Sequence, residues 1–279
     1  MKNICKYSFT ILIMISCVIA FTLFTVKTLF SESVSENIPT EMNKHTVETE
    51  KNTVETEKNT VEPTLPKDEA AFTAVKKKYL EDALFIGDSR TVGLSEYGKA
   101  GGVAFFADTG MSVFNIRDKK IKVKDVGTVS LKTLLSEHKY GKIYLMIGIN
   151  ELGYNMDRVM EEYDSLVSFI RKKQPDAVLF IEANLHVAKK RSDNDKYFNN
   201  KRINKLNRRM SKYADNKTSF YIDVNEIFDS KAGNLKAKYT GDGTHVLGKY
   251  YKKWVKWILT KGIDPKEDEI IDKSSGKTT

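Results

Sequence analysis

The chain has 279 residues, a net charge of +9, 41% hydrophobic residues and two cysteines. From residue 68 to about 261 the composition is globular, and this length is sufficient for a single domain with a substantial core. Both cysteines, Cys5 and Cys17, lie within the first thirty residues. The rest of the chain therefore has no disulfide, no thiolate metal site and no cysteine nucleophile.

An apolar run dominates the first thirty residues. No charged residue occurs from 7 to 26, and about 20 apolar residues are needed to cross a bilayer. We predict that residues 1–30 form a membrane anchor, with the N-terminus inside and the acidic downstream side exported. A cleaved signal peptide is the main alternative, although the run is long for one and lacks a clear small-residue cleavage site. Residues 14–17 faintly resemble a lipoprotein box, but the apolar run continues past Cys17.

Residues 31–67 contain a seven-residue repeat. The segment KHTVETE at 44–50 recurs as KNTVETE at 51–57 and decays in KNTVEPT at 58–64. Each unit offers one apolar residue, whereas a coiled-coil seam needs two. We therefore predict an acidic, disordered linker.

Charge is distributed unevenly along the chain. Residues 31–70 carry a net charge of −6 and the first thirty carry +3, so the total of +9 leaves +12 for residues 71–279. A surplus of this kind attracts polyanions. For an exported domain these are membrane head groups or anionic wall polymers rather than nucleic acid. The alternative is that the lysines only keep the surface soluble.

Residues 68–261 have the pattern of one globular α/β domain, followed by a polar tail at 262–279. Helical spacing is clearest after Asn155 and stops before Pro175, and two further helices are expected around 203–213 and 246–259. Strands alternating with helices predict a three-layer α/β/α sandwich with a five-stranded parallel sheet, of the flavodoxin-like kind. The five short apolar runs typical of buried strands are 83–86, 103–107, 142–147, 177–182 and 219–224.

Chemically useful residues follow several of these strands. Ser89 comes after the first run, Gly110 after the second and Asn150 after the third, while Asp242 and His245 come between the fifth run and the last helix. Ligands of such sheets gather outside the carboxyl ends of the strands. Each motif alone is an ordinary turn or cap, but together they favour a site. A hydroxyl nucleophile, an amide donor and a carboxylate-oriented imidazole suit serine acyl transfer.

Three blocks resemble those of the SGNH, or GDSL, hydrolases across roughly residues 80–260. Gly87-Asp88-Ser89 is similar to the nucleophile block. The segment 148–151, Gly-Ile-Asn-Glu, is similar to the Gly-x-Asn-Asp block, and the segment 242–245, Asp-Gly-Thr-His, to the Asp-x-x-His block. The glycine block at Gly110 is weaker, because only its place after the second strand selects it.

The chain departs from the family pattern at two positions. Arg90 stands where the GDSL name has leucine, and Glu151 replaces the usual aspartate. Neither change removes a catalytic atom. The α/β-hydrolase fold shares the Ser, Asp, His order but fits less well, because no Gly-x-Ser-x-Gly elbow surrounds Ser89.

The resemblance also implies roles for the residues. Ser89 would be the nucleophile, His245 its base and Asp242 the group that orients the imidazole. The oxyanion donors would be the backbone N–H groups of Ser89 and Gly110 and the side-chain amide of Asn150. No metal and no cofactor is expected. Of the other histidines, His45 lies in the linker and His138 in a predicted helix. His186 follows the fourth strand and could line the cleft, but an ordinary loop position is the simpler interpretation.

These features predict a membrane-tethered, extracytoplasmic serine esterase. It would remove O-acyl groups, such as O-acetyl, from a surface carbohydrate or cell-wall polymer through an acyl-enzyme. One alternative keeps the same triad but transfers the acyl group to a sugar hydroxyl. Another is a noncatalytic polymer-binding module. The expected partners are the acylated polymer and the membrane, with no nucleic acid.

Overall fold

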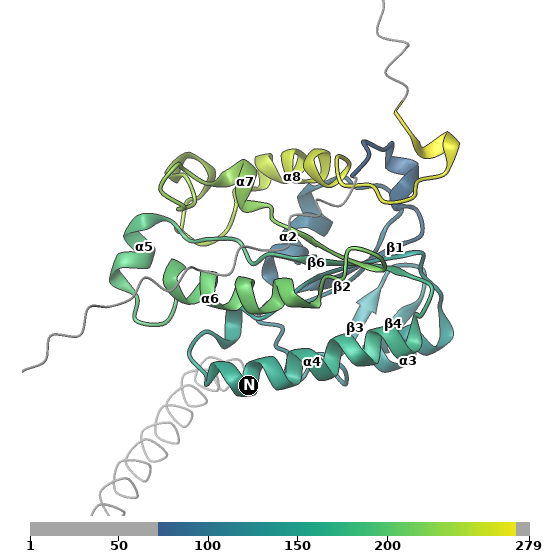
Figure 1. Cartoon of the computed structure of the whole chain (residues 1–279), viewed down its shortest axis with the longest axis horizontal. Coiled ribbons are helices and arrows are strands. Elements are labelled where there is room, and N and C mark those ends of the chain that lie inside the picture. The colour runs from purple at the N-terminus through teal and green to yellow at the C-terminus, as the bar shows by residue number, and fades with distance from the viewer. Residues whose placement is uncertain (1–71, 272–279) are drawn as a thin grey trace, which may run out of the picture. The chain divides into compact units, whose positions relative to one another are not determined.

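The structure is a computed structural model that describes residues 72–271 (Figure 1). The predicted membrane anchor and acidic linker, with His45, lie outside the described residues. Within residues 72–271 no helix is both long and apolar enough to cross a membrane.

Five parallel strands form the central sheet, in the order β2-β1-β5-β6-β7. The predicted α/β fold with a five-stranded parallel sheet is therefore confirmed. Each strand matches a predicted apolar run to within two residues at either end, because these runs are buried on both faces of the sheet. The strands are β1 (Ala83–Gly87), β2 (Ala104–Ala107), β5 (Lys142–Met146), β6 (Val178–Glu182) and β7 (Ser219–Ile222).

Helices cover both faces of this sheet (Figure 1). Alternate strand residues point to opposite faces, so Leu84 and Ile86 join one buried cluster, and Phe85 joins the other. The first cluster is closed by α3 (Leu131–Glu137), α4 (Met156–Lys173) and α6 (Asn200–Met210), and the second by α2 (Ser89–Tyr97), α7 (Asn225–Phe228) and α8 (Tyr251–Ile258).

Short helical turns occupy most of the connections. One of them, α5 (Lys189–Asn194), follows β6 and matters for the site. The others are 3-10 turns: η1 (Lys77–Leu80), η2 (Ile149–Glu151), η3 (Ser211–Tyr213), η4 (Ala237–Tyr239), η5 (Gly248–Tyr250) and η6 (Glu267–Glu269).

The longest helix, α4, has the apolar spacing that predicted it from the sequence. In α4 the buried side chains recur at helical spacing, and the Asn155 side chain caps the first turn by accepting hydrogen bonds from the backbone N–H groups of Asp157 and Arg158. The helix ends at Lys173, just before Gln174 and Pro175, because the residue before a proline is disfavoured in the helical region.

The structure adds one element and moves two expected boundaries. The antiparallel hairpin of β3 (Lys120–Val123) and β4 (Gly127–Ser130) was not predicted, since its strands are short and partly exposed. The last helix begins at Tyr251 rather than near 246, because Val246 instead pairs with Thr240 in an isolated bridge. The domain also continues past residue 261, where Gly262 and Ile270 form bridges with residues 73 and 75.

Candidate active site

Ser89 is placed by a sharp turn from β1 into α2. Gly87 ends the strand, Asp88 caps the helix by accepting from the Arg90 backbone N–H at 2.9 Å, and Ser89 is the first helical residue. A Cβ atom at Gly87 would lie 2.1 Å from the Thr91 hydroxyl and 2.5 Å from the Met146 carbonyl. Only glycine therefore allows this turn to pack against β5.

Ser89, His245 and Asp242 form a continuous hydrogen-bonded chain. The Ser89 Oγ lies 2.9 Å from His245 Nε2, and His245 Nδ1 lies 2.6 Å from Asp242 Oδ2. When Nδ1 carries its proton toward the carboxylate, Nε2 is free to accept from the serine hydroxyl. The side chains of His245 and Asp242 are 43% and 56% exposed, so this end of the chain opens onto the surface.

Backbone groups hold the Asp242 carboxylate in place. Its Oδ1 accepts hydrogen bonds from the backbone N–H groups of Thr244 and His245, each at 2.8 Å, and from the Thr240 hydroxyl at 3.2 Å. Partial burial acts to raise the pKa of Asp242, but the hydrogen bonds from the His245 ring and these amides outweigh it. The pKa of Asp242 is therefore well below its usual value, and the carboxylate stays charged beside the imidazole.

The three expected oxyanion donors follow three neighbouring strands of the sheet, β1, β2 and β5. Within residues 72–271, the backbone N–H groups of Ser89 and Gly110 donate to no protein group. The Asn150 amide donates one N–H to the carbonyl of Met111, next to Gly110, at 2.8 Å. This bond joins the Asn150 turn to the Gly110 loop and leaves the second N–H of the amide for another acceptor.

Glu151 has a positioning role that the sequence did not reveal. Its side chain is 1% exposed, and Oε1 accepts from the backbone N–H of Val113 at 2.9 Å. Burial raises the pKa of this carboxyl group. Glu151 therefore fastens the loop that follows Gly110, next to the bond that Asn150 makes. The only sequence signal was that Glu151 replaces the aspartate of the family block.

Ionisable groups are also buried next to the nucleophile turn. Arg90 is 1% exposed, and its Nη1 lies 3.9 Å from Asp88 Oδ1. Burial raises the pKa of Asp88. Burial, reinforced by the negative charge of Asp88, raises the pKa of Glu182 at the end of β6 to about 8. Arg90 thus occupies the leucine position as a buried cation beside a buried carboxylate.

The other described histidines take no part in the hydrogen bonds that join Ser89, His245 and Asp242. His186 lies in the loop after β6, as expected, and is buried there: Nδ1 lies 2.5 Å from Asp229 Oδ2, and Nε2 lies 2.8 Å from Asn204 Oδ1. His138 is the residue that follows α3, not part of the helix. Across residues 72–271, no group of three or more His, Cys, Asp and Glu side chains is placed to hold a metal ion.

A parallel α/β sheet with a hydrogen-bonded serine, histidine and aspartate at its carboxyl edge defines a serine hydrolase. The family model for the GDSL-like lipase/acylhydrolase family matches residues 85–253, which is more than half of the chain. The chain therefore belongs to the GDSL-like lipase/acylhydrolase family, as its three blocks had indicated, and it acts on ester bonds.

The comparison with solved structures found similar chains from several organisms. A Streptococcus pneumoniae protein described as a platelet activating factor is 18% identical, with a TM-score of 0.50 over 64% of this chain and 83% of its own. A GDSL-like lipase from Bacteroides thetaiotaomicron is 19% identical, with a TM-score of 0.47 over 68% and 92%. A carbohydrate esterase family 3 protein from Talaromyces cellulolyticus is 14% identical, with a TM-score of 0.44 over 64% and 93%. No curated protein matches the chain.

Proposed function

We propose that this protein is a membrane-tethered, extracytoplasmic serine esterase that removes O-acyl groups, such as O-acetyl, from a surface carbohydrate or cell-wall polymer. The hydrogen-bonded chain from Ser89 through His245 to Asp242 carries the catalytic part of the proposal. Its location and polymer substrate rest on the apolar run at 7–26 and on the positive charge of residues 71–279.

Acylation begins at the serine hydroxyl. Ser89 Oγ attacks the ester carbonyl while His245 Nε2 takes its proton, and the Asp242 carboxylate stabilises the imidazolium. The carbonyl oxygen becomes an oxyanion that accepts from the N–H groups of Ser89 and Gly110 and from Asn150. When the tetrahedral intermediate collapses, the bond to the sugar oxygen breaks, and that oxygen takes the proton from His245.

Deacylation repeats these steps with water. His245 removes a proton from water, the resulting oxygen attacks the acyl carbonyl, and the bond to Ser89 Oγ breaks as the proton returns to the serine. The enzyme is regenerated and the free acid leaves. If a sugar hydroxyl enters in place of water, the same steps give an O-acyltransferase. The open surface at His245 and Asp242 could admit either acceptor.

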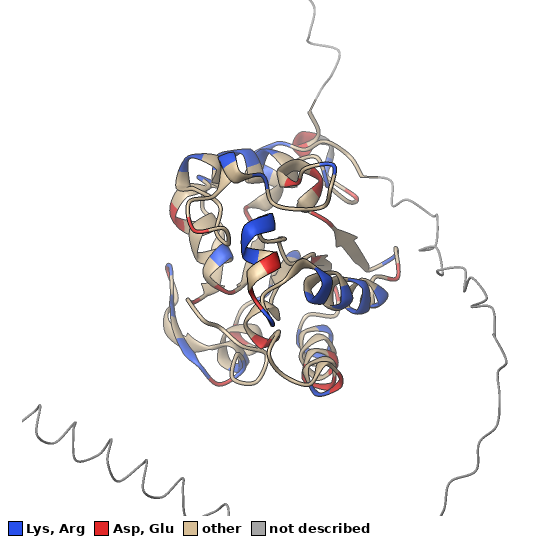
Figure 2. Ribbon diagram, turned by 90° about the vertical axis from the view of Figure 1, so that its left-hand side faces the viewer, with Lys and Arg blue, Asp and Glu red and all other residues tan. Residues whose placement is uncertain are grey.

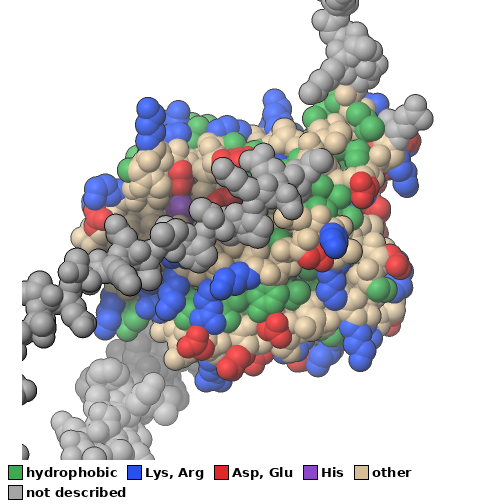
Figure 3. All heavy atoms as spheres, in the orientation of Figure 1, with side chains coloured by type: hydrophobic (Ala, Val, Ile, Leu, Met, Phe, Trp, Pro, Cys, Tyr) green, Lys and Arg blue, Asp and Glu red, His purple; other side chains and the backbone are tan. Residues whose placement is uncertain are grey.

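Two features support a polymeric, anionic substrate. The exposed imidazole and carboxylate lie where a long chain can reach them without threading into the protein. Lysine and arginine residues are spread over several helices and over the surface (Figures 2 and 3), in keeping with a domain that works beside anionic polymer. The hydrogen bonds that join Ser89, His245 and Asp242 argue against a noncatalytic binding module.

The test uses the full chain and a short acetyl ester, with and without sugar acceptors. We expect Ser89→Ala to abolish ester cleavage while its circular dichroism spectrum stays that of the wild type. Ser136→Ala, which changes an exposed serine on α3, is the matched control. Free acetate as the only acetyl-containing product identifies an esterase, and an acetylated sugar acceptor identifies a transferase. Wild-type ester cleavage by Ser89→Ala would overturn the serine mechanism.

A further inference from the structure

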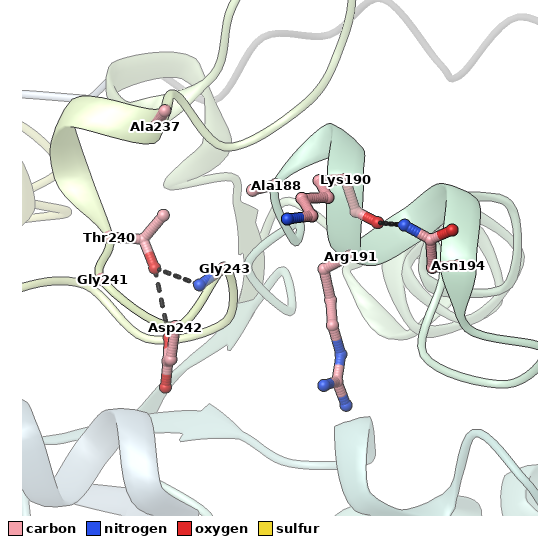
Figure 4. A pocket seen from close by; sticks show the side chains of 9 residues that line it. All are labelled: Ala188, Lys190, Arg191, Asn194, Ala237, Thr240, Gly241, Asp242 and Gly243. Carbon is pink, nitrogen blue, oxygen red and sulfur yellow. Dashed lines mark hydrogen bonds between the residues drawn. The ribbon is translucent and has the colours of Figure 1, made fainter.

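An open pocket of about 480 Å³ adjoins the catalytic aspartate (Figure 4). This volume is in the range of about 300–1,000 Å³ typical of small-molecule sites. One wall is α5 and the residue before it, and the other is the loop that leads to His245. The residues that line it are Ala188, Lys190, Arg191, Asn194, Ala237, Thr240, Gly241, Asp242 and Gly243.

The two walls are fixed to each other. The Ala188 backbone N–H donates to the Gly243 carbonyl at 2.8 Å. Gly243 has a φ of +78°, and a Cβ atom there would lie 3.2 Å from the Arg191 Cβ. Glycine thus provides both the left-handed turn and the close approach of α5. The pocket is therefore a fixed part of the loop that positions Asp242.

Two of the side chains that line the pocket, Lys190 and Arg191, carry positive charge that can bind an anion. Lys190 Nζ has no hydrogen-bond or ion-pair partner within residues 72–271. It extends from α5 toward the opposite wall, while the Arg191 guanidinium and the Asp242 carboxylate lie toward the same end of the pocket (Figure 4). Arg191 pairs with Asp195 at 3.2 Å but remains 44% exposed.

The nearby carboxylates already have donors. Asp242 accepts from the His245 ring and from two backbone amides. Asp195 accepts from the backbone N–H groups of Tyr197 and Phe198, and these bonds lower its pKa. Among the described residues, Lys190 is therefore the charge in this pocket that lacks a counterion, and Arg191 has donors to spare because a guanidinium offers five.

We propose that this pocket, which we call the Lys190 subsite, binds a carboxylate or phosphate substituent of the acylated carbohydrate. The inference rests on the proposed esterase function and makes it more specific. Lys190 and Arg191 would hold the anionic substituent while the ester lies at Ser89.

Substrate selectivity tests the subsite in the full chain. We would compare kcat/KM for an acetylated neutral sugar, an acetylated uronic acid and an acetylated sugar phosphate. The wild type should prefer at least one anionic ester, and the two anionic esters separate carboxylate from phosphate recognition. Lys190→Gln should reduce the ratio of anionic to neutral kcat/KM about three- to tenfold, and Lys190→Glu should reduce it further. High salt should weaken the same preference.

Lys189→Gln is the matched control, because it removes the same charge from the same helix at a position that does not line the pocket. We expect it to leave the ratio unchanged. Equal losses in Lys189→Gln and Lys190→Gln, or a wild-type ratio near one for both anionic esters, would overturn the subsite even if the neutral ester is cleaved through Ser89.

A binding measurement separates this inference from the esterase proposal. Calorimetry with glucuronate and glucose 6-phosphate on Ser89→Ala protein needs no turnover. Binding of either ligand that Lys190→Gln weakens in the same background supports the subsite even if every ester resists cleavage. Absence of binding to both ligands would refute it.

Discussion

Replacement of Asn150 by alanine should damage catalysis far more than folding. The Asn150 side chain donates one hydrogen bond to the Met111 carbonyl at 2.8 Å, and its second N–H is free for the oxyanion. Loss of a neutral hydrogen bond costs about 1 kcal/mol of stability. Loss of one oxyanion donor costs roughly 2.7–4 kcal/mol of transition-state stabilisation, or about 100- to 1000-fold in kcat.

The assay is steady-state cleavage of a short neutral ester together with urea unfolding. Because the oxyanion exists only after attack, kcat should fall while KM changes little. Asn155→Ala is the matched control. It removes the cap of α4 and should cost about 1 kcal/mol of stability, while kcat stays near the wild-type value.

Two results would refute this reasoning. A fall in kcat of less than about tenfold in Asn150→Ala would show that the amide is not an oxyanion donor. An equal fall in kcat for Asn155→Ala and Asn150→Ala would trace the effect to general destabilisation of the loop.

Three further predictions concern the aspartate, a buried carboxyl group and the tether. Asp242→Asn should lower kcat roughly a thousand- to ten-thousand-fold, because the imidazole loses its orienting charge; matched circular dichroism would exclude unfolding. Glu182 holds a proton in the folded state between its ordinary pKa of 4.5 and about 8, so stability should fall as pH rises through that window. Glu182→Gln should then be more stable than the wild type at pH values above about 8, on the order of a few kcal/mol by urea unfolding, and a decrease there would contradict the assignment. Protease added to intact cells should release the domain by cutting within residues 31–67, and a wholly protected domain would reverse the proposed topology.

Much of the fold could be predicted because the sheet is buried on both faces. The run at 142–147 is apolar throughout apart from its first residue and Tyr144, and it became β5. By contrast, β3 alternates exposed and buried residues over only four positions, and β4 is exposed or half-buried. So short a pattern is indistinguishable from a loop in the sequence.

The reacting groups could be predicted because they are carried by compact motifs at strand ends, and the structure brings Ser89, His245 and Asp242 within hydrogen-bonding distance. Their supports could not be predicted. The bond from Asn150 to Met111 joins residues 39 positions apart, and the bond between Glu151 and Val113 spans 38. Such partners depend on how the loops cross in space, which local spacing does not encode.

The pocket beside Asp242 could not be predicted from the sequence either. Its cationic wall, α5, has no buried residue and therefore no apolar periodicity to mark it as a helix. Lys190 and Arg191 become significant only when the Ala188 backbone N–H bonds to Gly243 and brings α5 against the catalytic loop.

Trapping of the acyl-enzyme tests the central claim most directly. The full chain would be mixed with a short acetyl ester, quenched with acid within the first turnovers, digested and analysed by mass spectrometry. We predict one added acetyl group on the peptide that contains Ser89, absent from Ser89→Ala and lost when the unquenched wild type is left with water. Ester cleavage with no acetyl group on Ser89 at any quench time, together with wild-type turnover by Ser89→Ala, would contradict it.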